Sequence, residues 1–275
     1  FRSSLALSRF YEAEISMPPP EKETTFCWSS YKKSQQLCYT LSMELLISIN
    51  RGVYPVGSLL PSHKELAVQK GVSVSTVRRS LKLLDSVGAI KSANYVGTKV
   101  LPFEEATENS DFTVPVLQRR LLDMAESLQI LALSCKDVSL LTLSCLDSNA
   151  LEKMCLELKV HGQKKQGETL SYFALNYFAK LAPYQTIRMV YSELLRQLFW
   201  AYALRGMKDG LETINAIYAS YFDSLIESLE KKNFSRFSAN LEGLVIYDLR
   251  RTIDSLTRLG IPGTENILIP DESQY

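Results

Sequence analysis

The sequence has only two histidines, His63 and His161, among its 275 residues. This scarcity leaves no Cys–His or Ser–His–Asp arrangement in which a base could activate a nucleophile. The sequence also contains no glycine-rich phosphate-binding loop and no paired metal motif. We therefore expect no catalytic residues and no enzyme.

Cysteine is also sparse, and long apolar runs are missing. The five cysteines include no C-x-x-C pair, and three of them lie in apolar sequence with a helical pattern. Cysteines of this kind behave as small hydrophobes, which indicates a reduced, cytoplasmic protein without a disulfide framework. No apolar run reaches the roughly 18 residues needed to cross a bilayer, so we expect no membrane partner.

The net charge of +1 hides an uneven distribution of the two signs. Residues 31–102 contain ten Lys or Arg and three acids, whereas residues 103–275 contain 18 basic and 23 acidic residues. A basic segment joined to an acidic one is typical of a nucleic-acid-binding domain on a body that does not bind nucleic acid. The alternative is a basic face that is simply solvated.

The basic segment carries the signals of three helices. Residues 34–50 have an apolar residue at every fourth position. These are Leu37, Leu41, Leu45 and Ile49. Ser62 has Glu65 three residues later, the spacing of a capping box, and Ser73 can cap a longer amphipathic helix.

Two short strands, 89–91 and 99–101, are expected after these helices. Three helices and a small β-hairpin wing make a winged helix-turn-helix, so we assign residues 31–102 to a DNA-binding domain of that kind.

Outside this domain we expect an arm, a linker, a helical body and a tail. Residues 1–30 contain a triple proline and indicate an arm or linker, with a truncated upstream domain as the alternative. Residues 103–112 are acidic and aperiodic, which indicates a linker. Residues 113–260 predict an all-α bundle of six or seven helices, and residues 261–275 form the tail. The expected helices are 116–133, 136–160, 169–180, 183–205, 210–231 and 235–259, so the fold class is mainly α.

The helix-turn-helix segment contains a longer motif. It has P-S-H-K-E-L-A at 61–67 and G-V-S-V-S-T-V-R at 71–78, followed by Leu84, Gly88, Ile90, Gly97 and Thr98. In order and spacing, the segment 57–100 resembles the GntR family of bacterial transcription regulators. The resemblance implies that the helix starting at Ser73 and the wing around Gly97 bind operator DNA.

The candidate DNA-binding residues lie on the two helices of the turn and in the wing. They are Ser62, Lys64, Ser73, Val74, Ser75, Thr76, Arg78, Arg79, Gly97, Thr98 and Lys99. Hydroxyls and amides at a helix N-terminus suit phosphate oxygens or base edges, and the cationic side chains suit backbone phosphates.

The chain departs from the family pattern where the family reads guanine. Val74 replaces a base-reading Arg, Tyr95 and Val96 replace Gly-Arg in the wing, and Lys64 replaces an Arg of the preceding helix. A bidentate base contact contributes about 1–3 kcal/mol of discrimination. We expect weaker guanine readout or recognition of a thymine methyl by Val74, with backbone affinity partly restored by Arg79. A remnant that no longer binds DNA is the alternative.

The helical body resembles the all-helical C-terminal domain of the fatty-acid-regulator branch of that family. Arg119, Leu122 and Asp123 resemble its R-x-x-L-E opening, and residues 222–233 resemble a later segment. Many members of the branch bind a metal through one Asp and three His. The roughly aligned positions here are Ala174, Phe222 and Leu244, so we expect no metal and no cofactor, and we expect His161 to be a solvated loop residue.

A pocket for an effector is still possible between the helices. The candidates combine aromatic and polar groups on helices expected to face inward. They are Arg119, Tyr172, Asn176, Tyr177, Arg188 and Tyr191. The resemblance to the fatty-acid-regulator branch implies that Arg119 meets an acidic effector; the alternative is that all six are ordinary core and surface residues.

Taken together, these features predict an effector-responsive transcription regulator, with repression as the expected sign. It would bind a pseudopalindromic operator as a homodimer, one half-site per winged helix, and the body would couple the effector to DNA binding. The alternative is a diverged winged-helix interaction protein without DNA binding.

Overall fold

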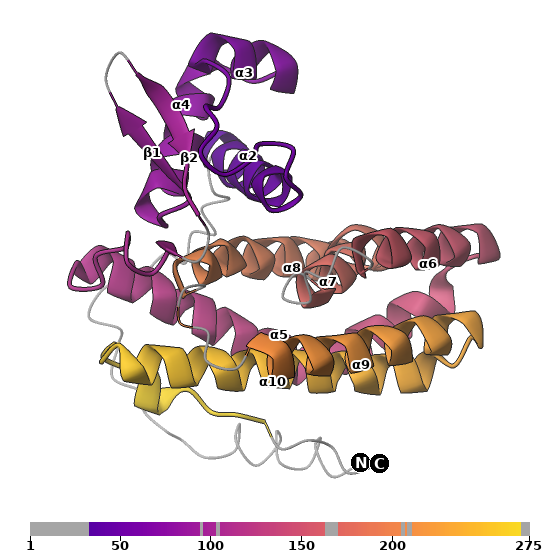
Figure 1. Ribbon diagram of the computed structural model, residues 1–275. Coiled ribbons are helices and arrows are strands. Elements are labelled where there is room, and N and C mark those ends of the chain that lie inside the picture. Colours follow the sequence, from indigo (N-terminus) through magenta and orange to yellow (C-terminus); the bar gives the residue numbers. More distant parts are fainter. Residues whose placement is uncertain are drawn as a thin grey trace, which may run out of the picture. The chain divides into compact units, whose positions relative to one another are not determined.

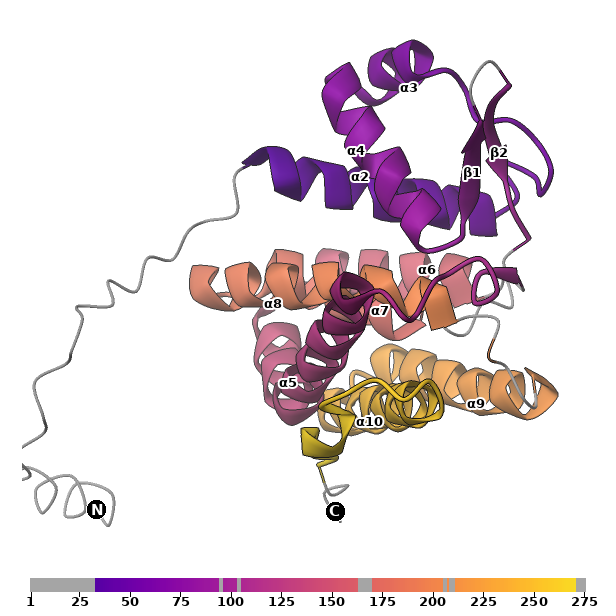
Figure 2. The same ribbon diagram turned by 90° about the vertical axis from the view of Figure 1, so that its left-hand side faces the viewer.

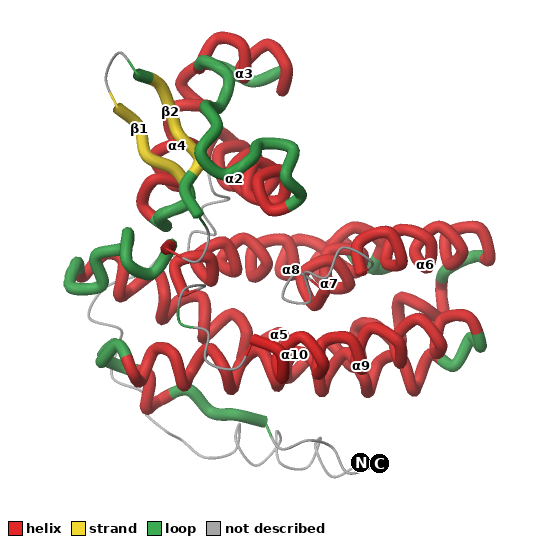
Figure 3. Tube along the Cα trace, in the orientation of Figure 1, coloured by secondary structure: helices red, strands yellow, loops and turns green. Residues whose placement is uncertain are grey.

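The protein is described from a computed structural model that covers residues 33–93, 96–102, 105–162, 170–204, 207 and 211–270. Within these residues it contains nine α-helices, two short 3-10 helices and one two-stranded sheet (Figures 1 and 3), which confirms the mainly α fold class. Residues 34–275 form one compact unit. The expected arm at 1–30 lies outside the described residues.

Helix α2 (Lys33–Asn50) packs through the face predicted from its apolar spacing, except at its first turn. Leu41, Leu45 and Ile49 are buried, whereas Leu37 is exposed. Near the start of α2 the buried face runs through Cys38 instead, because α4 (Val74–Ser86) crosses α2 at small residues. There the Ser80 hydroxyl donates to the Cys38 carbonyl at 2.9 Å.

The helix starts in the turn have the caps expected from the sequence. At the start of α3 (His63–Lys70), Ser62 and Glu65 form a complete capping box. The Glu65 carboxylate accepts from the Ser62 amide at 2.8 Å, and the Ser62 hydroxyl accepts from the Glu65 amide at 3.3 Å. Ser73 caps α4 by accepting from the Thr76 amide at 3.1 Å.

The wing consists of β1 (Ile90–Ala93) and β2 (Gly97–Val100), which pair antiparallel. Ile90 faces Val100, Lys91 faces Lys99 and Ser92 faces Thr98. Both strands extend further toward the hairpin tip than the predicted strands did.

The first part of the expected linker packs against the winged-helix domain. Ala106 is fully buried, and its carbonyl lies 2.6 Å from where a Cβ on Gly88 would be. Gly88 has a φ of +70°. The chain therefore leaves the domain by a close backbone approach that only glycine permits.

We refer to the helices that follow as the helical body. They are α5 (Pro115–Cys145), α6 (Ser148–Gly162), α7 (Leu170–Leu181), α8 (Gln185–Gln197), η3 (Leu198–Leu204), α9 (Leu211–Glu230), α10 (Phe234–Arg258) and η4 (Thr264–Asn266). Helix α5 packs along α10 (Figures 1 and 2), and α7 contacts both α8 and α10. Phe178 of α7 and Phe237 of α10 meet edge to face in the core.

The predicted helix break between 133 and 136 was wrong. Helix α5 continues to Cys145, because Ser134 satisfies its hydroxyl by donating to the Ile130 carbonyl one turn earlier and Cys135 is buried. The break comes at Asp147, whose carboxylate accepts from the Ala150 amide at 2.8 Å and so caps α6.

Helix α5 is long and apolar enough to cross a membrane by length and composition, but it packs against α10 in the body. The residues expected as a tail are also partly packed, since Ile261 and Ile267 are buried. Gly263 contacts Leu122 of α5, so the chain after α10 contributes to the body's core.

Candidate nucleic-acid interface

The start of α4 holds three hydroxyls that were predicted to contact DNA. The Ser73 hydroxyl lies 2.9 Å from that of Ser75 and 2.8 Å from that of Thr76. Thr76 is only 4% exposed, whereas Ser73 and Ser75 are on the surface. The structure therefore leaves Ser73 and Ser75 accessible and turns Thr76 into the domain, as part of the cap.

One face of α4 is cationic and open to solvent. Ser75, Arg78, Arg79 and Lys82 are all exposed and lie at helical positions i, i+3, i+4 and i+7, which places them on one side. Arg79 donates its Nε–H to the Ser75 carbonyl at 3.4 Å. Lys82 was not among the predicted DNA-binding residues, although its spacing of four from Arg78 indicates the same helix face; Lys91, described next, was not among them either.

The wing adds a second cationic group. Lys91 of β1 and Lys99 of β2 are exposed and directly opposite one another. Gly97, with a φ of +111°, begins β2 beside the Leu59 side chain. Thr98 is buried on the other face of β2, where its hydroxyl lies 3.1 Å from that of Ser92, so it does not lie on the exposed face with Lys99.

The replaced base-reading positions have mixed environments. Val74 is half-buried and packs against the core of the domain, which restricts its contact with a thymine methyl. Val96 is exposed at the hairpin tip, and Tyr95 lies outside the described residues. Lys64 is exposed on α3, and Ser62 serves in the capping box.

Few of these cations are neutralised. In the described part of the winged-helix domain, an ion pair joins Lys70 and Glu44 at 2.5 Å. No carboxylate partner is found among the described residues for a second group of cations. They are Lys64, Arg78, Arg79, Lys82, Lys91 and Lys99. We call Arg78, Arg79 and Lys82 with Lys91 and Lys99 the cationic surface.

The six residues predicted for an effector pocket are not brought together. Arg119 is exposed and pairs with Asp123 at 2.7 Å on the same helix. Tyr191 is buried with its hydroxyl 2.9 Å from that of Ser134. Tyr177 donates to Glu157 instead of facing a cavity.

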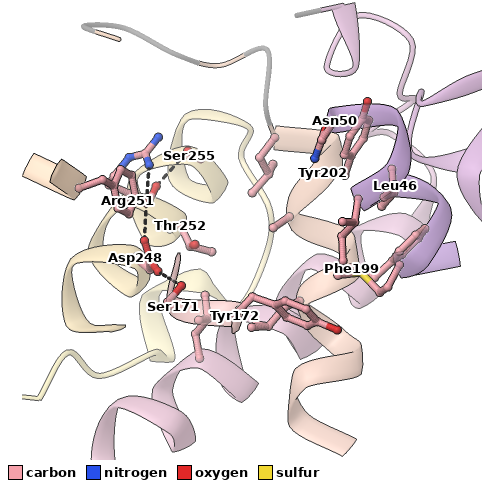
Figure 4. Close-up of a pocket in the computed structure, with 17 residues that line it drawn as sticks. Leu46, Asn50, Ser171, Tyr172, Phe199, Tyr202, Asp248, Arg251, Thr252 and Ser255 are labelled. Atoms are coloured by element: carbon pink, nitrogen blue, oxygen red, sulfur yellow. Dashed lines mark hydrogen bonds between the residues drawn. The ribbon is translucent and has the colours of Figure 1, made fainter. Parts of the chain in front are cut away.

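The remaining three differ from one another. Arg188 donates to the carbonyls of Ala182 and Pro183 at the turn before α8. A cavity of about 150 Å³ lies between α2 and the helical body (Figure 4); Tyr172 lines it, whereas Asn176, half-buried on α7, does not. Arg119 also lies 3.5 Å from Glu126, so two carboxylates of its own helix flank its guanidinium.

The positions aligned with metal ligands in related regulators are apolar here. Ala174 and Leu244 are fully buried, and Phe222 packs against the core. No group of three or more His, Cys, Asp or Glu residues able to hold a metal is present among the residues that the structure describes. His161, which was expected in a loop, is instead in the last turn of α6, and its side chain lies outside the described residues.

The sequence of the winged-helix domain is similar to that of known proteins. Residues 40–100 match the model of the family described as bacterial regulatory proteins, gntR family. Over 68 residues, which are 25% of this chain, it is 37% identical to the uncharacterized HTH-type transcriptional regulator YieP of Escherichia coli. The chain covers only 30% of that curated relative's length.

Two solved structures are similar over longer stretches. One is a putative transcriptional regulator GntR from Rhodococcus sp. RHA1, with 14% identity, 79% of this chain and 97% of that chain covered, and a TM-score of 0.40. The other is a Streptococcus agalactiae GntR, with 18% identity, 78% and 99% coverage, and a TM-score of 0.33. The matched family and relatives are transcription regulators and not enzymes, and residues 40–100 are the helix-turn-helix domain by which this chain matches the gntR family.

Proposed function

We propose that the protein is a transcription regulator that binds operator DNA through α4 and the wing. The observation that carries this proposal is the cationic surface, five exposed cations with no carboxylate partner in the described part of the chain. Unneutralised Lys and Arg on one helix face are the electrostatic footprint of a polyanion site.

The arrangement supports a division of roles. The α4 face, with Ser75, Arg78 and Lys82, suits the major groove, and Lys91 with Lys99 suits the flanking phosphates. Because no Arg occupies the position of Val74 and Val74 is half-buried, base readout depends on Ser75, on Arg78 and on the shape of the DNA. Specificity for guanine should therefore be weak.

The finer parts of the proposal concern regulation. The protein acts in the cytoplasm as a homodimer on a pseudopalindromic operator, whose half-sites are one helical turn apart. It represses, and an effector bound by the helical body shifts the spacing of the DNA-binding domains. The support for this part is the sequence resemblance of roughly residues 117–256 to the fatty-acid-regulator branch, carried by Arg119, Leu122 and Asp123 and by residues 222–233.

The salt dependence of binding to random duplex DNA tests the central claim. If the five cations of the cationic surface meet phosphates, the slope of log K against log salt should be about −4 to −5 per winged helix, at about −0.9 per contact. Replacing both Arg78 and Lys82 by Ala should make the slope less negative by about 2. Fluorescence anisotropy of a labelled duplex measures both quantities.

Lys70→Ala is the matched control, because it also removes a cation but one that is already paired with Glu44. It should leave the slope unchanged. A flat salt dependence for the parent protein would overturn the proposal and favour a winged helix used for protein contacts. Selection of bound sites from a random DNA library then identifies the operator.

A further inference from the structure

The wing is wider than β1 and β2 alone, because the chain before α3 runs beside β2 as a short third strand. Leu59 forms an antiparallel bridge with Lys99. Next to this bridge, the Val100 amide donates to the Ser58 carbonyl at 2.9 Å. The backbone at Leu59 is therefore held at the edge of β2 that faces away from β1.

Three exposed side chains form a row across these strands. Directly opposed residues of antiparallel strands have their side chains on the same face of a sheet. Leu59 is opposite Lys99, and Lys99 is opposite Lys91. We call these three residues the wing row. In it, one aliphatic side chain lies beside two lysines, and neighbouring strands are about 5 Å apart.

The leucine of the wing row is open to solvent. Leu59 is 54% exposed, whereas the next residue, Leu60, is 6% exposed. The two terminal carbons of Leu59 lie 3.6 and 3.7 Å from the position of a Cβ on Gly97, so the leucine covers that glycine. Val96, beside Gly97 at the hairpin tip, is 66% exposed. The surface around Gly97 is therefore apolar, although it adjoins the two lysines.

This combination of side chains restricts the ligand that the wing row fits. A single exposed leucine is ordinary, but here it shares one face with Lys91 and Lys99, which have no carboxylate partner among the described residues. A ligand on this face must present anionic groups to the lysines and apolar groups to the leucine within about 10 Å. Duplex DNA does so at its minor groove, where phosphates border walls made of deoxyribose rings.

The position of the wing relative to α4 leads to the same groove. Helix α4 ends at Ser86 and β1 begins at Ile90, so the wing follows the helix directly. With α4 in the major groove, an element at its side crosses the phosphates that separate the two grooves and meets the minor groove next to them.

We propose that the wing row lies in the minor groove and that Leu59 makes the protein prefer A·T pairs there. This inference rests on the function proposed above and adds a sequence preference to it. Guanine carries a 2-amino group on the floor of this groove, and an aliphatic side chain over it would remove its water without offering an acceptor. The narrower groove of A·T sequences brings the sugar walls closer to Leu59, and its more negative potential favours the two lysines.

Three alternating DNA polymers test the preference on the full chain. They are poly(dA-dT), poly(dG-dC) and poly(dI-dC). An inosine–cytosine pair has the major-groove edge of G·C but the minor-groove edge of A·T, because inosine lacks the 2-amino group. In competition with a labelled random duplex at equal salt, anisotropy should show poly(dA-dT) and poly(dI-dC) binding at least about fivefold more tightly than poly(dG-dC).

Leu59→Ala shortens the exposed side chain without removing a cation. It should reduce the difference between poly(dI-dC) and poly(dG-dC) to less than about twofold and leave the salt slope unchanged. Leu59→Ile keeps an aliphatic side chain and should retain the preference. Leu156→Ala is the matched control, because Leu156 of α6 is 63% exposed and lies in the helical body. It should retain the full difference.

Equal binding of poly(dI-dC) and poly(dG-dC) by the parent protein would overturn the inference, since any preference would then come from the major groove. An unchanged difference in Leu59→Ala would overturn it as well. In both cases a steep salt dependence would leave the proposed function standing. Absence of binding to all three polymers would overturn the proposed function and this inference with it.

Discussion

Gly88 lies where the winged-helix domain contacts the segment that follows the wing, and its backbone conformation and surroundings both require glycine. Its φ of +70° and the Ala106 carbonyl at 2.6 Å from a would-be Cβ act together. The first feature disfavours any side chain, and the second leaves no room for one. A glycine that satisfies both conditions is much harder to replace than one in an open turn.

Gly88→Ala should lower the free energy of unfolding by about 2–4 kcal/mol, since the left-handed conformation costs about 1–2 kcal/mol and the clash with Ala106 adds to it. Gly52→Ala is the control, because Gly52 has a φ of +72° and nothing within 4 Å of the added Cβ. It should cost only about 1–2 kcal/mol. Urea unfolding measures both, and equal losses would contradict the close approach at Gly88.

Ser73 and Ser75 should separate stability from DNA binding. Ser73→Ala removes the cap of α4 and should cost about 1 kcal/mol of unfolding free energy. Ser75→Ala, on the exposed face, should change stability by less than about 0.5 kcal/mol but weaken DNA binding. Urea midpoints and anisotropy on the same two proteins check this; loss of stability in both would place Ser75 in the cap.

At the scale of elements, the sequence was sufficient to predict those features that depend on contacts between residues close together in the chain. The caps of α3 and α4 were predicted because Ser62, Glu65 and Ser73 act on amides within three residues. The end of α5 was not, because Ser134 and Cys135 can end a helix or sit within one, and burial against the rest of the body decides between them.

The candidate site divides in the same way. Exposure of Arg78 and Arg79 follows from helical spacing, and the burial of Thr98 could have been predicted from the alternation of Gly97, Thr98, Lys99 and Val100 along β2. The cavity could not be predicted from the sequence, because it depends on how α2, α7 and α10 pack. The angles at which helices pack cannot be derived from a single sequence. That is why only Tyr172 of the six expected pocket residues lines it.

A pair of buried serines links the two long helices of the body. Ser139 of α5 donates to Ser238 of α10 at 2.8 Å, and both are fully buried. Ser139→Ala should cost about 1–3 kcal/mol because Ser238 loses its partner. The double change to Ala should cost less than the sum of the two single changes. Additive losses in a double-mutant cycle would show that the pair does not interact.

At the scale of the whole molecule, the buried apolar residues form one continuous cluster from Leu41 of α2 to Ile267, beyond the end of α10. Tyr39 and Phe199 lie at one crossing between the winged-helix domain and the body, and the Thr107 hydroxyl donates to the Ala203 carbonyl at another. Continuity of this kind favours cooperative unfolding of residues 34–275.

Urea unfolding should therefore give one transition. A Trp28→Phe variant leaves Trp200 of η3 as the only tryptophan, so its fluorescence reports on the body, whereas far-UV circular dichroism reports on all helices. The two midpoints should coincide. Separate midpoints would show that the winged-helix domain unfolds independently of the body.

The facing lysines of the wing have one more consequence. Like charges directly opposite each other on a β-ribbon repel and destabilise it. In the absence of a bound anion, the repulsion between Lys91 and Lys99 therefore lowers the stability of the wing. A polyanion lying between the two ammonium groups would relieve that repulsion and turn it into binding free energy. The wing is then at its least stable when unbound, and multivalent anions such as heparin or polyphosphate should slow the exchange of its backbone amides with solvent.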